Sequence, residues 1–148
     1  MPDYIYCGTD AQVSMDNTRA LLKAAEAIWC PPPLLRPWHV RTEPAGGERV
    51  WLCWSPTPEG PLSLLAGGRL LPNPRALTSS PVIWTDPGAR ATAIELGYTG
   101  PTNMTFLKLV KVRFLDRERD LDLVLPSGLS ELAPRQASLL SSLLPIPS

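Results

Sequence analysis

Apolar residues gather in several short stretches of the chain, and each stretch is bounded by proline, glycine or charged residues. Short runs with alternating or continuous apolar positions, flanked by turn residues, are typical of β-strands. The strands predicted in this way cover residues 3–7, 48–54, 62–71, 81–85, 106–115 and 121–125, with residues 37–41 extended as well. The chain is therefore predicted to consist mainly of short strands joined by turns, one of which is the charged turn "DRERD" over residues 116–120.

One segment has its apolar residues at helical spacing instead. A helix over residues 18–30 would place Leu21, Leu22, Ala25, Ile28 and Trp29 on one face. Asp16 and Asn17 are suited to cap its start, and Pro31 would end it. We expect this helix to cover one open end of the sheet.

Two further helices are predicted later in the chain. Residues 86–97 start with an N-cap aspartate and stop at a glycine. Residues 133–145 form a closing helix whose buried face would carry Leu139, Leu140, Leu143 and Leu144. The last four residues, "PIPS", are expected to fray.

Two strands contain irregular positions. Gly67 and Gly68 lie within the strand 62–71, where glycine indicates a bulge or the close approach of another backbone. In the strand 106–115 the alternation slips once. A bulge near residues 109–110 would turn the apolar residues inward and leave Lys108, Lys111 and Arg113 outside.

Five to seven strands with two or three helices predict an α+β fold. A chain of 148 residues with 44% hydrophobic residues matches one domain with its own core, here residues 1–148. So many strands do not all lie flat in a small domain, so we expect a small mixed β-sheet, curved or closed into a barrel, with helices covering its ends.

Charge and cysteine content narrow the function. With 14 basic and 14 acidic residues the net charge is zero, which is not the charge of a protein that grips duplex backbone. Recognition of one base or small ligand in a pocket remains compatible with it. Cys7, Cys30 and Cys53 have no zinc-site spacing, and His39 is the single histidine, so we predict reduced cysteines and no metal.

The start of the chain and the length of its apolar runs indicate a cytoplasmic protein. The start lacks the basic and apolar regions of a signal peptide, and no apolar run reaches the length of about 18 residues that a membrane helix needs.

Catalytic motifs are missing from the sequence. No phosphate-binding loop or Ser-His-acid motif occurs, and Cys7 as a nucleophile would need a base that the sequence does not indicate. We therefore expect no cofactor, and a binding module rather than an enzyme.

The strand "ERVWLCW" carries two tryptophans with different expected roles. Alternation puts Trp51 and Trp54 on opposite faces. Trp51 is expected to pack under a helix or loop. Trp54 stands at the strand end, where we expect it to be partly buried at a pocket rim and to stack on a base. The alternative is that Trp54 fills the core.

Other polar and aromatic residues in turns complete the candidate site. The full set of candidate ligand contacts is Thr9, Asp10, Asn17, Trp38, Trp54, Ser55, Trp84 and Asn103, and the candidate phosphate contacts are Lys108, Lys111 and Arg113. Aspartate accepts from an exocyclic amine of a base, and tryptophan stacks on its face. Turn formation, helix capping and an ordinary solvent-exposed strand face explain the same residues without a ligand.

The central hairpin resembles the PUA-like superfamily, especially its EVE-type members. The resemblance rests on the strand–helix opening, on "GGERVWLCWS", on "LLAGGRL" and on "KLVKVRF". The Gly-x-Lys-x-x-Glu-x-Arg stretch of the ASCH-type branch is absent. The resemblance implies a module that reads a base, modified or not, of RNA or DNA in an aromatic-lined pocket beside the first helix.

Two other classes of function stay open. One is a protein-interaction module of a bacterial conflict system, an immunity protein or inhibitor, which the neutral charge and the 18 prolines also suit. The other is a small enzyme on the same fold. A tryptophan-walled pocket would favour base binding, an exposed apolar patch would favour a protein partner, and a buried His39 paired with an acid would favour an enzyme. The sequence does not indicate an oligomeric state.

Overall fold

The structure is a computed structural model that describes residues 2–9, 15–30, 45–57, 60–71, 105–123, 125 and 128–147. The elements in chain order are β1 (Tyr4–Thr9), α1 (Met15–Ala25), β2 (Ala27–Cys30), β3 (Arg49–Ser55), β4 (Leu62–Leu70), β5 (Thr105–Leu121), β6 (Gly128–Glu131) and α3 (Pro134–Leu143). The predicted strand 81–85, the extended stretch 37–41 and the helix 86–97 lie outside the described residues.

The described strands form one mixed sheet in the order β2-β5-β4-β3-β1-β6. β1 pairs with β3 in parallel, and the other neighbours are antiparallel. In the described part of the chain β2 and β6 are the two edges and do not pair with each other, so the sheet is open. The α+β class and the strand number agree with the sequence prediction, whereas closure into a barrel is wrong for these strands.

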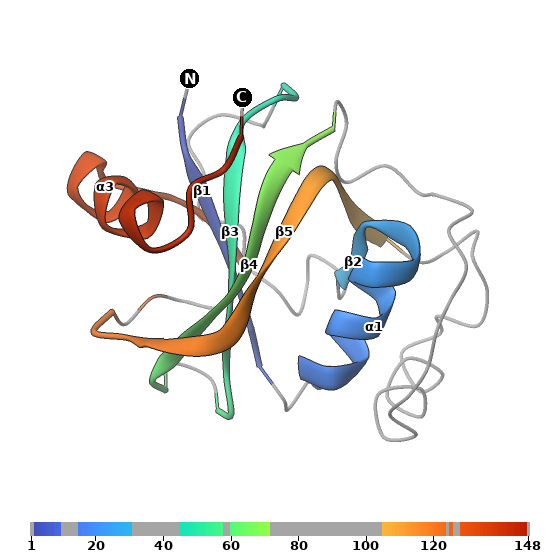
Figure 1. The fold of residues 1–148 in the computed structure, drawn as a ribbon, viewed down its shortest axis with the longest axis horizontal. Helices are drawn as coiled ribbons and strands as arrows, with labels where there is room; N and C mark the ends of the chain where they lie inside the picture. Colours follow the sequence, from blue (N-terminus) through green and yellow to red (C-terminus); the bar gives the residue numbers. More distant parts are fainter. Residues whose placement is uncertain are drawn as a thin grey trace.

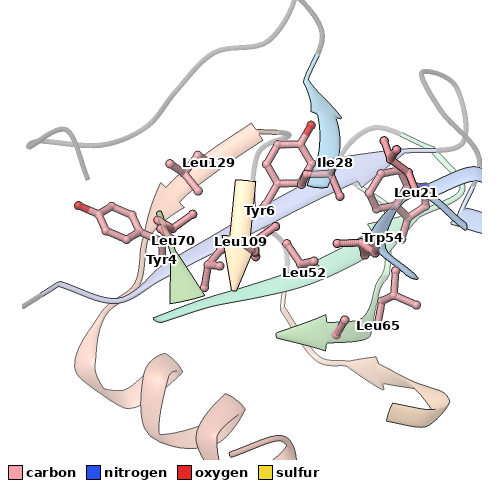
Figure 2. Packing of buried hydrophobic residues seen from close by; sticks show 13 residues of the cluster. Tyr4, Tyr6, Leu21, Ile28, Leu52, Trp54, Leu65, Leu70, Leu109 and Leu129 are labelled. Atoms are coloured by element: carbon pink, nitrogen blue, oxygen red, sulfur yellow. The ribbon is translucent and has the colours of Figure 1, made fainter. Parts of the chain in front are cut away.

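The two described helices cover opposite faces of this sheet (Figure 1). Alternating residues of the central strands feed two cores. The core under α1 contains Tyr4, Tyr6, Leu21, Leu22, Ile28, Val50, Leu52, Trp54, Leu65, Ala66, Leu70, Leu109 and Leu129, and Figure 2 shows its packing. The core under α3 contains Ile5, Cys7, Trp51, Cys53, Leu62, Leu64, Leu121, Leu140, Leu144 and Ile146. Each helix therefore packs on a sheet face, and α1 does not plug an open end.

The first helix differs from its prediction at both ends. It begins at Met15, so Asp16 and Asn17 lie in its first turn and do not precede it. It ends at Ala25, because Glu26 takes the left-handed conformation with φ of 49°. The segment after it, predicted as helix, is the strand β2 and pairs with β5. Ile28 and Trp29 favour extended backbone, and this preference outweighs their helical spacing.

β5 carries the predicted bulge. Its pairing with β4 slips between Gly67 and Arg69, opposite the segment from Val110 to Arg113. A Cβ atom on Gly68 would lie 3.0 Å from the carbonyl oxygen of Val110, so the glycine permits this close approach. The bulge confirms the prediction drawn from the glycine pair and the slipped alternation.

β5 is also longer than predicted. It continues past residues 116–120, for which a charged turn was expected, because Arg119, Asp120 and Leu121 pair with the start of β4 beyond a register shift between Leu64 and Ala66. Residues 121–125 are accordingly not the last strand. That strand is β6, whose sequence "GLSE" lacks the apolar run that is typical of a strand.

The C-terminal segment after α3 packs against the sheet as far as Pro147. In α3 and after it, Leu140, Leu144 and Ile146 are buried, whereas Leu139 is 43% exposed. Ile146 packs where Gly67 leaves room, and Arg69 Nε donates to the carbonyl oxygen of Pro147 at 2.7 Å. The expectation that this tail frays is wrong for these residues.

Candidate functional site

The parallel strands β1 and β3 end at the same edge of the sheet. Gly8 is level with Trp54, and Thr9 with Ser55. Carboxyl ends of parallel strands are a common place for ligands in sheets covered by helices. The chain leaves β1 at this edge, and only residues 10–14 separate the end of β1 from the first turn of α1 in the sequence. This edge, formed by the carboxyl ends of β1 and β3 and not by the edge strands β2 and β6, is the candidate functional site.

Trp54 lies in the core under α1 and is only 3% exposed. Its ring centroid is 6.4 Å from that of Tyr6, with the planes tilted by 36°. A Cβ atom on Gly8 would overlap the indole, so the ring lies directly over this glycine. The expected partial burial at a pocket rim is wrong, because the missing side chain of Gly8 lets the ring pack directly against β1.

Trp51 packs on the opposite face, as predicted. It is fully buried in the core under α3, and its Nε1 donates to the carbonyl oxygen of Leu144 at 3.0 Å. The Arg49 guanidinium lies 5.0 Å from the ring centroid, within the range of a cation–π contact. Trp51 thus ties β3 to the end of α3.

Thr9 has the least satisfied side chain at the site. It is 2% exposed, and its Oγ1 has no hydrogen-bond partner in the described part of the chain. Ser55 beside it is satisfied locally, since its hydroxyl donates to the carbonyl oxygen of Thr57 at 2.6 Å. By strand alternation Thr9 and Ser55 face α3, like Cys7 two residues earlier.

The predicted contacts are thus divided between two faces. Asn17 and Thr18 are buried on α1, four residues before Leu21 and Leu22, and so lie on its sheet-facing side together with Trp54. Thr9 and Ser55 are on the other face, and the two groups share only the sheet edge. Asp10, Trp38, Trp84 and Asn103 lie outside the described residues.

The predicted phosphate contacts are on β5, away from this edge. Lys108 pairs with Ala27 of β2, while Lys111 and Arg113 are exposed. Arg113 is level with Gly67 and, through it, with Trp51 in the middle of β3. These residues therefore do not lie at the level of Thr9.

Sequence reasoning missed the charges of β5 that are level with the candidate site. Asp120 is opposite Ser63, which is opposite Trp54, and Arg119 is opposite Leu64 in the next row. Ser63 Oγ and Asp120 Oδ1 are 3.1 Å apart. The charged sequence "DRERD" is typical of a turn, so nothing in it indicates a place in a long strand. The exposed Arg119 is the basic residue nearest this level of the sheet among those described on β5.

A separate hollow lies beside the start of β1. It has a volume of about 310 Å³ and is lined by Pro2, Asp3, Arg49, Leu132, Pro134, Ala137 and Ser138. Arg49 Nε and Nη2 donate to the two carboxylate oxygens of Asp3 at 2.8 and 2.9 Å. This hydrogen bonding raises the pKa of Arg49. The pair neutralises its own charge, and no tryptophan lines the hollow.

Cys7 and Cys53 are free thiols within the core under α3. Burial raises the pKa of Cys7 to about 12. The pKa of Cys53 is raised well above its ordinary value, chiefly by burial and secondly by the negative charge of a Cys7 thiolate. Both are therefore protonated at neutral pH, and while Cys7 is buried in the folded protein it lacks the lowered pKa of a catalytic cysteine.

The described residues contain no group of three or more histidine, cysteine or acidic side chains placed to hold a metal ion. No helix among them has the length and apolar character needed to cross a bilayer. Compared with known protein families, curated proteins and solved structures, the chain matches none.

Proposed function

We propose that the protein is a PUA-like binding module of the EVE type that holds one nucleic-acid base at the edge where β1 and β3 end. The observation that carries this proposal is the hydroxyl of Thr9, which is buried and has no partner among the described residues. A buried hydroxyl without a partner costs about 1–3 kcal/mol, so it calls for a missing water, ion or ligand.

The chemistry of a base edge fits this hydroxyl. Threonine both donates and accepts, so it can pair with an amine or a carbonyl group of a base. Trp54 is packed against Gly8 and Tyr6, and in this proposal it supports the site from the core. The tryptophans left to stack on the base are the candidates Trp38 and Trp84. The zero net charge suits a site that reads one base with few phosphate contacts.

Short single-stranded RNA and DNA oligonucleotides, with and without modified bases, test the proposal when titrated at low and high salt. We expect one base to be preferred and Thr9→Val to weaken its binding roughly 2- to 10-fold, the effect of one hydrogen bond. The same change should leave the Tm equal or higher, because it removes an unpaired buried hydroxyl.

Ser130→Ala is the matched control. Ser130 also has a buried hydroxyl without a described partner, but it lies level with Ile5, far along β1 from Thr9. This variant should bind as the wild type does. The proposal is wrong if no oligonucleotide is preferred by its base, or if Thr9→Val binds as tightly as Ser130→Ala.

A protein-interaction module is the competing function, and the described residues give it little support. Leu139 is the one large hydrophobic side chain among them that is exposed, so they present no extended apolar patch. His39, on which the enzyme alternative depends, lies outside the described residues.

A further inference from the structure

Cys7 and Cys53 face each other across two hydrogen-bonded strands. They are direct partners in the parallel register of β1 and β3, and both side chains belong to the core under α3. Neighbouring strands lie about 4.8 Å apart. This spacing is within the Cα separation of about 4.4–6.8 Å that a disulfide spans. The negative charge of a Cys7 thiolate raises the pKa of Cys53, which agrees with a short distance between the two sulfur atoms.

We propose that Cys7 and Cys53 are a latent redox pair that closes a disulfide between β1 and β3 when it reacts with a low-molecular-weight disulfide. The inference stands apart from base binding, since it uses only the strand register and the two thiols. In the structure both are free, which is the reduced state of the pair.

The reaction balances as two thiol–disulfide exchanges. Cys7, the more exposed of the two, loses its proton and its sulfur attacks the small disulfide, releasing one small thiolate that takes up a proton. Cys53 then loses its proton, its sulfur attacks that of Cys7, and the second small thiolate leaves and is protonated. The protein thiols lose two electrons, which reduce the small disulfide to two thiols.

Burial makes this reaction slow in the folded protein. Cys7 is 2% exposed, Cys53 is fully buried, and thiolates are the reactive form. On the other side of Cys7 lies Gly128 of β6, which is the edge strand of the described sheet. We expect the oxidant to enter when β6 separates from β1, a local opening that is more frequent at sheet edges.

The experiment measures the equilibrium from the refolding direction, where access is not limiting. A Cys30→Ser variant removes the third thiol. It is refolded in glutathione buffers of stepped redox ratio, its free thiols are alkylated, and its mass and peptides are mapped. We expect a species that has lost two hydrogens, with Cys7 linked to Cys53, and a Tm roughly 5–10 °C above that of the reduced form. If Cys30→Ser does not fold, peptide mapping of the wild type distinguishes the three cysteines.

Cys7→Ala combined with Cys30→Ser is the control and should show no such mass change and no shift of Tm. The proposal is overturned if the folded protein keeps two free thiols, or carries glutathione on each, at every redox ratio. It is equally overturned if the linked form melts below the reduced form, because strain would then outweigh the cross-link.

Discussion

Gly8 and Trp54 are a matched pair of residues in the core under α1. The indole lies where a side chain on position 8 would be, and the two residues are direct partners on parallel strands. A glycine inside a strand usually weakens it, unless close packing needs the space. Here the space is filled by the largest side chain, so neither residue can change without affecting the other.

We predict that Gly8→Ala destabilises the protein by about 1–3 kcal/mol through overpacking. Trp54→Leu should cost somewhat less than the 3–5 kcal/mol typical of a buried tryptophan reduced to alanine. The double variant should be more stable than the sum of the two costs predicts, by about 0.5–3 kcal/mol, because leucine leaves room for the new methyl group. Urea unfolding of the four proteins measures this coupling. Additive costs would show that the ring does not depend on Gly8.

Cys7 should make the stability of the protein fall at alkaline pH. Its pKa is raised by burial from about 9 to about 12 in the folded state. Below pH 9 the thiol is protonated in both states, and its contribution is complete. As the pH rises from about 9 toward 12, the unfolded chain releases this proton and the folded chain keeps it, so the free energy of unfolding falls by up to about 1.4 kcal/mol per pH unit.

Cys7→Ala removes this contribution and isolates it from other groups that titrate in the same range. Relative to neutral pH, we expect the wild type to lose about 1.4 kcal/mol more than the variant at about pH 10. The measurement is urea unfolding of both proteins, reduced, at both pH values. Parallel pH profiles would mean that Cys7 is not buried as a thiol.

At the scale of elements, the junction between α1 and β2 depends on Glu26. Its φ of 49° ends the helix, its amide donates to Leu22 at 2.9 Å, and its carbonyl oxygen accepts from Leu109 of β5 at 2.9 Å. Glycine takes this conformation without the steric cost that other residues incur. The exposed Glu26 carboxylate adds one long contact of 3.4 Å to the amide of Val112.

We predict that Glu26→Gly stabilises the protein by about 0.5–1 kcal/mol, since it relieves the left-handed strain while keeping both backbone bonds. Glu26→Val should destabilise it by about 1–2 kcal/mol, because a β-branched residue is least tolerant of positive φ. Thermal melts of the two variants check the signs. A stabilising valine would mean that Glu26 does not end the helix as described.

The same junction shows why some elements could be predicted and others not. β1, β3, β4 and the closing helix follow local patterns, and their predicted bounds hold with small shifts, although Leu139 is exposed and does not lie on the buried face of the helix as predicted. β2 has helical spacing, but its residues also favour extended backbone, and pairing with the distant β5 makes it a strand. β6 is four residues long, and its partner β1 lies more than a hundred residues away in the chain. Such pairings are set by distant segments that no local window contains.

At the scale of the whole molecule, the parallel pairing of β1 with β3 decides where the candidate residues lie. A closed sheet would have gathered the strand ends around one opening. The open sheet instead has two covered faces, and alternation sends Trp54 to one and Thr9 to the other. The sequence showed which residues stand at the strand ends, but their separation follows from the register of strands distant in sequence.

The C-terminal tail makes the α3 face one unit. Ile146 packs on Gly67 in β4, and Arg69 on the same strand donates to Pro147 and, at 2.6 Å, to the carbonyl oxygen of Gly47 before β3. The tail thus connects the helix, two strands and the turn before β3. A residue at the end of the chain should for this reason contribute to global stability.

We predict that Ile146→Ala destabilises the whole domain by about 2–3 kcal/mol, near the lower end for a buried isoleucine because it lies at the margin of its core. Leu139→Ala is the matched control, since this side chain on α3 is exposed and should change stability by no more than about 0.5 kcal/mol. Urea unfolding measures both, and an unchanged m value would show that Ile146→Ala weakens the single cooperative transition without detaching the tail alone. Equal midpoints for the two variants and the wild type would place Ile146 outside the core, and the tail would then be an appendage of the sheet.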